Sequence, residues 1–205
     1  MRRLFCDPWR PLLFAIAVGA ACGTAVAASP TVTGPLLERL RICSSCHGED
    51  GNSRTVGVPS IAGQPKIFLE NQLVLFREGV RAAPPLKQPA VAGLTDREIS
   101  TIAGVFGASP VQSGPGSSDP SRAKRGRALA QELGCGSCHL PDFQGREQIP
   151  RLAGQREEYL VEAMTGFRHS RRPAADTAMT LVLYGVSDAD IEAMAHFFSS
   201  YRQRD

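Results

Sequence analysis

The sequence has little net charge, no long apolar run and no recognisable strand. These absences argue against a nucleic-acid-binding protein, a membrane span and a β-fold, respectively. A formal net charge of +3 over 205 residues provides no basic surface for nucleic acid, so no nucleic-acid partner is expected. The apolar run at residues 12–21 is short for a membrane span, which needs about 20 residues. Because the apolar periodicity is helical, we predict an all-α fold.

Residues 1–28 carry the three-part pattern of a secretory signal peptide. Arginines precede the apolar run, and small residues ending at Ala27 and Ala28 provide a cleavage site. We therefore predict a periplasmic protein that is cleaved near Ala27 or Ala28, with a mature net charge of about +1. An uncleaved anchor and lipid attachment at Cys22 are the alternatives.

Cysteine is also scarce, and its placement is informative. Two of the six cysteines lie in the leader, and the other four form CSSCH at 43–47 and CGSCH at 135–139, which leaves no thiol for a structural disulfide. C-x-x-C-H is the attachment signature of a c-type haem, because two thiols on one helical turn can each add to one porphyrin vinyl group. A redox dithiol or half a zinc site needs no adjacent His. We predict two covalently bound haem c groups (iron), attached through Cys43, Cys46, Cys135 and Cys138, with proximal iron ligands His47 and His139.

The two motifs belong to a longer repeat at an offset of 91 or 92 residues. PSIAGQ at 59–64 matches PRLAGQ at 150–155, and GLTDREI from Gly93 matches GVSDADI from Gly185. A segment rich in Pro, Gly and Ser separates the copies and is typical of a linker. We predict a first domain at 29–109, a linker at 110–121 and a second domain at 122–205.

Helical spacing and capping motifs place the main helices of each copy. One helix is expected from Gly34 or Pro35 to about Ile42, leading into the first C-x-x-C-H, and another over 66–77. The Thr95-x-x-Glu98 sequence predicts a capping box at the start of a third. The second copy repeats this pattern with a helix around 159–167 and another that starts at Ser187.

The chain resembles a di-haem class I cytochrome c of the cytochrome c4 family. The resemblance rests on the two C-x-x-C-H motifs, the two AGQ segments, the Phe-Arg pairs at 76–77 and 167–168, and the two helix starts, and it covers nearly the whole mature chain. It implies two tandem class I cytochrome c domains, each wrapped around a covalent haem and related by pseudo-two-fold symmetry. It also implies that the backbone carbonyls of Pro59 and Pro150 accept hydrogen bonds from the proximal histidines, whose tautomer they would fix.

The second domain offers a methionine as its distal iron ligand. Met179 is expected in a loop, eight residues before Ser187, and its thioether would favour Fe(II). Met164 and Met194 fall on inward helix faces, where Met usually fills the core. His169 is the rival ligand, whereas His196 has the pattern of an ordinary, partly buried helical histidine.

The first domain departs from the family pattern, because it contains no Met and no His other than His47. The position eight residues before Thr95 is Lys87, so the first haem could take a neutral amine from Lys87 as its ligand. It could instead be open or water-bound, or take a ligand from elsewhere, such as Lys66 or a partner protein. Each alternative lacks the soft thioether, so we predict a lower potential for the first haem.

Electron transfer without substrate chemistry is the leading functional hypothesis, and an enzyme is the less favoured one. The expected partners are redox proteins such as a terminal oxidase, a quinol-oxidising complex or a dehydrogenase, through which the protein could associate with a membrane. The rival hypothesis is a haem enzyme or sensor with an open or lysine-gated first haem. A structural domain that anchors a larger complex is a third, unsupported by any insert. Arg81 and Arg172 match across the repeat and suggest a shared propionate or surface feature.

Overall fold

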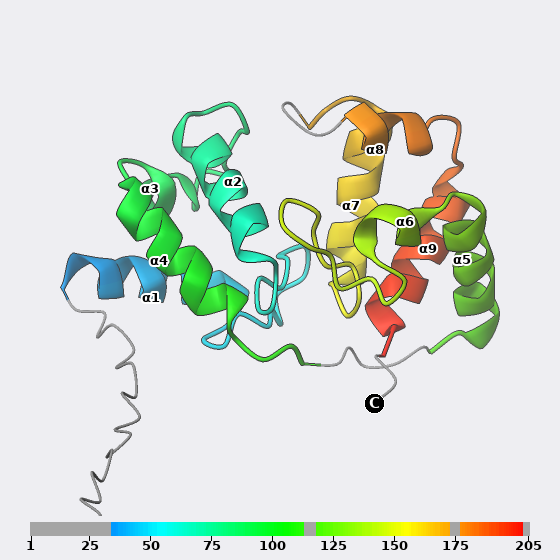
Figure 1. Cartoon of the computed structure of the whole chain (residues 1–205), viewed down its shortest axis with the longest axis horizontal. Helices are drawn as coiled ribbons and strands as arrows, with labels where there is room; N and C mark the ends of the chain where they lie inside the picture. The colour runs from blue at the N-terminus through cyan, green and yellow to red at the C-terminus, as the bar shows by residue number, and fades with distance from the viewer. Residues whose placement is uncertain (1–33, 113–117, 173–176, 203–205) are drawn as a thin grey trace, which may run out of the picture. The chain divides into compact units, whose positions relative to one another are not determined.

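Helices account for the regular structure of the described residues. The computed structural model describes residues 34–112, 118–172 and 177–202, so the predicted signal peptide and residues 113–117 of the predicted linker lie outside it. Within these ranges, β-structure is limited to one isolated antiparallel bridge between Arg146 and Ile149. The prediction of an all-α fold is therefore confirmed (Figure 1). We call residues 34–112 the first half and residues 118–202 the second half.

The first half is built from four helices around one apolar core (Figure 1). Thr95 caps α4 with the predicted capping box, in which its side chain accepts from the Glu98 amide and the Glu98 carboxylate accepts from the Thr95 amide. The core joins the apolar faces of the second and fourth helices, with Leu69, Phe76 and Ile102 among its buried members. The helices are α1 (Pro35–His47), α2 (Lys66–Arg77), α3 (Gln88–Val91) and α4 (Asp96–Gly107).

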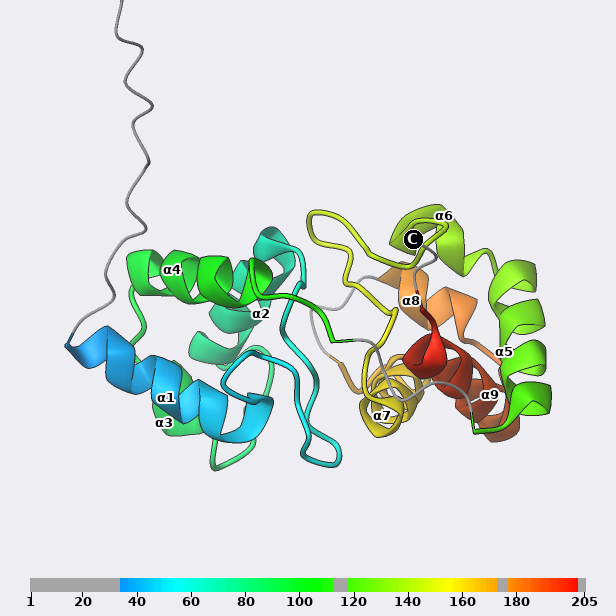
Figure 2. The ribbon, with the colours of Figure 1, turned by 90° about the horizontal axis from the view of Figure 1, so that it is seen from below.

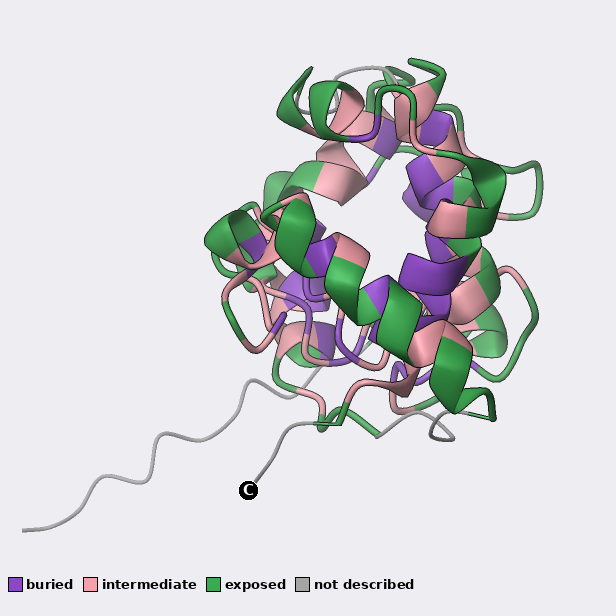
Figure 3. Cartoon of the chain, turned by 90° about the vertical axis from the view of Figure 1, so that its right-hand side faces the viewer, coloured by how far each residue is buried: buried purple, intermediate pink, exposed green. Residues whose placement is uncertain are grey.

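The second half repeats this plan and buries more of its last helix. Its helices are α5 (Pro120–Glu132), α6 (Cys135–His139), α7 (Glu157–Arg168), α8 (Thr177–Val182) and α9 (Asp188–Ser200). Ser187 caps α9 as predicted, its hydroxyl accepting from the Asp190 amide. The buried residues run in bands along the helices (Figure 3), and Ile191, Met194 and Phe198 of α9 lie in the core.

Two elements differ from the sequence-based expectation. Met179 was expected in a loop, but it lies within the short helix α8. Helix α5 begins at Pro120, inside the predicted linker, because the Asp119 carboxylate accepts hydrogen bonds from the Ser121 and Arg122 amides and caps the helix. The last two residues of the predicted linker therefore form the first turn of the second half.

Helices α5 and α9 cross at a glycine. A Cβ atom built on Gly126 would overlap the carbonyl oxygen of Ala193 and come within 2.8 Å of the Cβ atom of Phe197. The overlap is with backbone, which cannot turn aside as a flexible side chain can. The close approach of the first and last helices of the second half therefore depends on the absence of a side chain at residue 126.

Gly126→Ala is expected to destabilise the second half by about 3 kcal/mol or more, because overpacking against backbone forces the two helices apart. The matched control is Gly104→Ala in α4, where the nearest atom to a new Cβ is the Lys66 Cε at 3.9 Å. That variant should be neutral or stabilised by up to about 1 kcal/mol through helix propensity. Urea unfolding of both holoprotein variants, followed by circular dichroism, measures the difference. Equal midpoints for Gly126→Ala and the wild type would contradict the proposed helix crossing.

The two AGQ segments are fixed in the same way in each half. The Gly63 amide donates to the Phe106 carbonyl at 3.0 Å, and the Gly154 amide donates to the Phe198 carbonyl at 2.9 Å. Both glycines have positive φ angles, 59° and 65°, a region that favours glycine. Each AGQ turn is thus anchored to the last helix of its own half, and this sets the position of the glutamine that follows.

Candidate cofactor site

Each C-x-x-C-H motif lies on one helical turn. The first occupies the end of α1 and the second forms α6. In each pair the first cysteine is half-buried and the second exposed, and burial raises the pKa of the Cys43 and Cys135 thiols. The two cysteines of each motif therefore lie on the same helical turn, as attachment to the two vinyl groups of one porphyrin requires.

Both motif histidines donate a hydrogen bond to a proline carbonyl. The distance from His47 Nδ1 to the Pro59 oxygen is 2.8 Å, and that from His139 Nδ1 to the Pro150 oxygen is also 2.8 Å. A carbonyl can only accept, so Nδ1 carries the proton and the lone pair of Nε2 is available for a metal. Burial lowers the pKa of both histidines and so favours the neutral form that ligates iron.

Met179 lies against the core of the second half. Its partly buried side chain packs on the same cluster as the half-buried Cys135. The rival His169 is exposed at the end of α7, where its Nε2 atom lies 3.2 Å from the Arg168 guanidinium. Met164 and Met194 are buried core residues, as their helical spacing predicted. Among the described residues of this half, the geometry therefore favours Met179 as the distal ligand.

His196 is more deeply buried than the sequence suggested. It is 4 % exposed, and its Nδ1 atom lies 2.8 Å from Oε2 of Glu157. Glu157 also pairs with Arg122 of α5, so the histidine belongs to a polar contact that joins three helices. Its surroundings indicate a structural role.

Lys87 precedes α3 and turns its side chain inward. Its Nζ atom lies 3.4 Å from the centroid of the Phe76 ring, a core residue of the first half. Burial, together with the positive charges of Arg81 and Arg172, lowers the pKa of Lys87 to about 7, and the Cys43 thiol acts in the opposite direction. Cys43 of the first motif packs against the cluster to which Phe76 belongs, so Lys87 and the motif contact the same core.

Arg81 and Arg172 are half-buried around one tyrosine. Arg172 donates to the Tyr159 hydroxyl at 3.3 Å, while Arg81 lies over the Phe76 ring and donates to the Gln72 side chain. Burial lowers the pKa of Arg81. Burial alone would raise the pKa of Tyr159, but the two guanidinium groups together hold it below its ordinary value. This partly desolvated positive charge is better matched to an anionic group than to a solvated surface.

Two glutamines join the halves through reciprocal hydrogen bonds. The Gln64 side chain accepts from the Arg151 amide at 2.9 Å and donates to the Arg151 carbonyl at 3.0 Å. The Gln155 side chain accepts from the Ser60 amide at 2.7 Å and donates to the Ser60 carbonyl at 2.8 Å. Because Ser60 and Arg151 follow the two histidine-binding prolines, these bonds join the two loops that hold the proximal histidines. The loop between α1 and α2 and the loop between α6 and α7 lie side by side in Figure 2.

Arg151 adds an unequal contact to this junction. Its side chain is 1 % exposed and donates to the carbonyls of Ala62 in the first half and Ala153 in the second. Burial lowers its pKa to about 10. The matching residue of the first half is Ser60, so this pair departs from the pseudo-two-fold symmetry.

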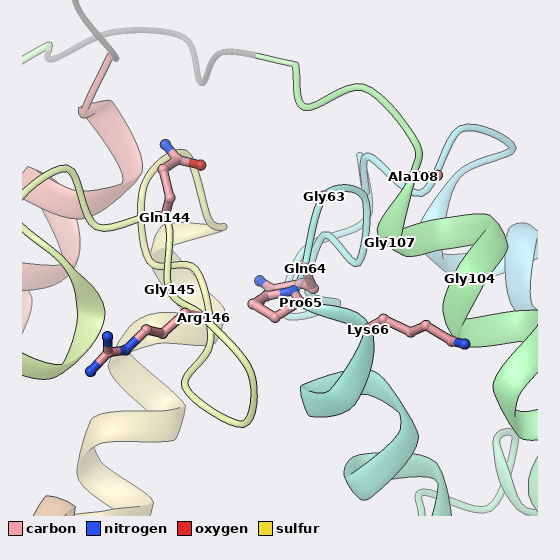
Figure 4. A pocket seen from close by; sticks show the side chains of 10 residues that line it. All are labelled: Gly63, Gln64, Pro65, Lys66, Gly104, Gly107, Ala108, Gln144, Gly145 and Arg146. Carbon is pink, nitrogen blue, oxygen red and sulfur yellow. The ribbon is translucent and has the colours of Figure 1, made fainter.

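An open groove of about 510 Å³ also lies along this junction (Figure 4). Gln64, Pro65 and the backbone of 144–146 contribute to it, and neither C-x-x-C-H motif does. The Lys66 side chain runs toward α4 at Gly104 and pairs with Glu70 at 3.4 Å. Lys66 is therefore directed along the surface, unlike Lys87.

These residues fit covalent haem. Each half brings together a thiol pair on one turn, a neutral histidine with a free Nε2 and an adjacent apolar cluster. Arg81 and Arg172 would face the propionates. Haem c bound at these motifs supplies a one-electron couple between Fe(III) and Fe(II). The protein contributes the axial donors, the hydrogen bonds that orient them and the apolar surroundings that exclude water.

The described residues show neither a metal-binding cluster of the usual side chains nor a membrane-spanning helix. Residues 34–112, 118–172 and 177–202 contain no group of three or more His, Cys, Asp or Glu side chains arranged to hold a metal ion. In the same residues, no helix has the length and apolar character needed to cross a membrane.

The fold and the two motifs define a class I c-type cytochrome with two tandem domains. The cytochrome c family model matches residues 123–201. Cytochrome c4 of Stutzerimonas stutzeri is 31 % identical over 180 residues, which cover 78 % of this chain and 84 % of that protein. The crystal structure of reduced recombinant cytochrome c4 from Pseudomonas stutzeri superposes with a TM-score of 0.71 at 29 % identity, covering 83 % of this chain and 100 % of that one. The chain belongs to the cytochrome c4 family.

A related protein carries a more specific name. A thiosulfate dehydrogenase electron acceptor of Stutzerimonas stutzeri strain A1501 is 29 % identical over 177 residues, with 80 % of each chain covered. The similarity extends over most of both chains. The proteins that this chain resembles therefore include one named as an electron acceptor of a dehydrogenase as well as cytochromes c4.

Proposed function

We propose that the protein is an exported, periplasmic cytochrome that holds two haems and carries single electrons between redox proteins. Electrons would enter at the first half, which has the lower potential, and leave from the second. The observation that carries this proposal is the unequal pair of distal positions. Met179 packs against the same core cluster as Cys135 in the second half, whereas the first half has Lys87 at the matching position and contains no methionine.

The unequal ligands support a direction of electron flow. A thioether is a soft donor that favours Fe(II), so its absence lowers the potential of the first half relative to the second. The glutamine bonds hold the two proximal loops together and so favour rapid exchange between the two sites. An electron would therefore pass downhill from the first half to the second within one molecule.

A dehydrogenase is the electron donor that we favour among the expected partners. The support comes from the relative named as a thiosulfate dehydrogenase electron acceptor, which matches most of this chain. The acceptor could then be a terminal oxidase. Stopped-flow mixing of the oxidised protein with a thiosulfate dehydrogenase and thiosulfate tests this assignment, and absence of haem reduction above the enzyme-free control would count against it.

A redox titration of the purified holoprotein tests the carrier proposal. We expect two one-electron waves separated by more than about 59 mV, which corresponds to a tenfold difference in equilibrium constant. The lower wave should belong to the first half and the higher wave to the half with Met179. Two coincident waves, or a lower potential in the second half, would contradict the proposed direction of flow.

A further inference from the structure

We propose that Lys87 binds the iron of the first haem through its neutral amine as the sixth ligand. This inference rests on the proposed presence of haem in both halves and goes beyond it by assigning the distal donor. Two observations carry it, namely the position of Lys87 in the repeat and the direction of its side chain, and the cationic side chains near its amine support it.

The surrounding contacts place Lys87 where the second half has Met179. Arg77 donates to the Leu94 carbonyl at 3.0 Å, and the matching Arg168 donates to the Val186 carbonyl at 2.6 Å. These bonds fix the end of each distal segment at the same point, immediately before the residue that caps the last helix.

The buried residues of the two distal segments agree with this register. Val91 and Leu183 occupy matching positions, and each is 2 % exposed. Each lies four residues beyond the candidate ligand, Lys87 or Met179. A register shift by one residue would move these apolar side chains out of the core, so the match is fixed by packing as well as by sequence.

The Lys87 side chain points toward the apolar core of the first half. Its Nζ atom lies 3.4 Å from the centroid of the Phe76 ring, and Phe76 is 5 % exposed. Cys43 of the first motif packs against the same apolar cluster that contains Phe76, so the amine and the motif share this cluster. A solvated lysine would instead extend its amine into water.

The electrostatic surroundings favour an uncharged amine. Arg81 and Arg172 are the cations that act on Lys87, and burial adds to their effect. Ligation then replaces the bound proton by iron, and the proton leaves to solvent.

The alternative is that Lys87 remains a cation over the Phe76 ring and leaves the iron open or bound to water. Cation–π contacts of this kind occur in many proteins. The chain provides a matched control, because Lys66 is the other lysine of the first half and lies on the surface beside Glu70. If Lys87 binds the iron, substitution of Lys87 should change the spin state of the first haem, and substitution of Lys66 should not.

Electron paramagnetic resonance of the ferric holoprotein at neutral pH distinguishes these states. The wild type should give two low-spin signals, and Lys87→Ala should convert one of them to high-spin while Lys66→Ala leaves both unchanged. Lys87→Met should keep both irons low-spin and about double the thioether-to-iron charge-transfer band, because a second methionine then ligates. This variant keeps the inference testable if Lys87→Ala loses haem during assembly.

Two results would overturn the inference. One is a high-spin signal already present in the wild type and unchanged in Lys87→Ala, and the other is a pair of low-spin signals that Lys87→Ala does not alter. An open first haem would instead favour a site that binds small-molecule ligands. The carrier proposal is judged separately, because an open iron and a lysine-ligated iron both predict two unequal redox waves.

Discussion

Replacing Met179 with leucine should lower the higher of the two midpoint potentials by on the order of 0.2 V, a sizeable part of the roughly 0.8 V over which axial ligands tune haem. Leucine keeps the apolar contact with the second core but removes the sulfur. The iron of that half would lose the donor that favours Fe(II), so its reduction becomes harder. Spectroelectrochemical titration of the wild type and the variant measures the shift.

Met164→Leu is the matched control for Met179→Leu. Met164 is 7 % exposed in the core of the second half, and volume-conserving exchange there should cost less than about 1.5 kcal/mol without changing the potentials. The Met179 variant should also lose its charge-transfer band, whereas the control keeps it. A Met179→Leu protein with both potentials unchanged would show that another residue ligates the second iron.

The same variant tests the direction of electron flow. With Met179 absent, the potential of the second half should approach or fall below that of the first half. Electrons delivered to the first half would then no longer move downhill to the second. Partial reduction by one electron equivalent should therefore leave the electron mainly on the second half in the wild type but distribute it between the halves in Met179→Leu.

Much of the architecture follows directly from repeated local signals. The bounds 66–77 of α2 match the prediction, and the capping residues Thr95 and Ser187 start α4 and α9 as expected. These signals are local, because a capping side chain bonds an amide three residues away and helical periodicity repeats within one element. The fold class could therefore be predicted from the sequence without any knowledge of long-range contacts.

The candidate site could be predicted only in part from the sequence, because its contacts join residues far apart in the chain. The AGQ repeat was visible in the sequence, but nothing in it indicated that each glutamine would bond the other half. Nor did the Phe-Arg pairs reveal that Arg77 and Arg168 fix the distal segments. Met179 was expected in a loop, because the six-residue helix α8 lacks a long apolar period.

The inward direction of Lys87 likewise depends on long-range packing. The sequence identified the residue by its distance from Thr95, and three alternatives remained for the distal ligand. The contact with Phe76 and the two arginines that act on the amine come from segments separated by loops. The sequence could thus specify which residue was available, whereas the structure shows where its amine points.

Removing the two junction glutamines together should uncouple the halves. Each of Gln64→Ala and Gln155→Ala removes the partners of one buried amide and one buried carbonyl across the junction, at about 1–3 kcal/mol per group. Gln155→Ala also removes the acceptor of the Arg156 amide. A loss of only 2 kcal/mol shifts the balance between joined and separated halves by roughly 30-fold. We expect the double variant to unfold at lower urea concentration and to exchange electrons between the halves more slowly.

Pulse radiolysis of the double variant separates this role from a general loss of stability. Electron tunnelling falls steeply with distance, so loosening the loops next to Pro59 and Pro150 should slow internal exchange while each half keeps its own midpoint potential. Gln131→Ala, on the exposed face of α5, is the matched control and should leave both exchange and stability unchanged. Exchange at the wild-type rate in the double variant would mean that other contacts, such as the buried Arg151 guanidinium, hold the two proximal loops together.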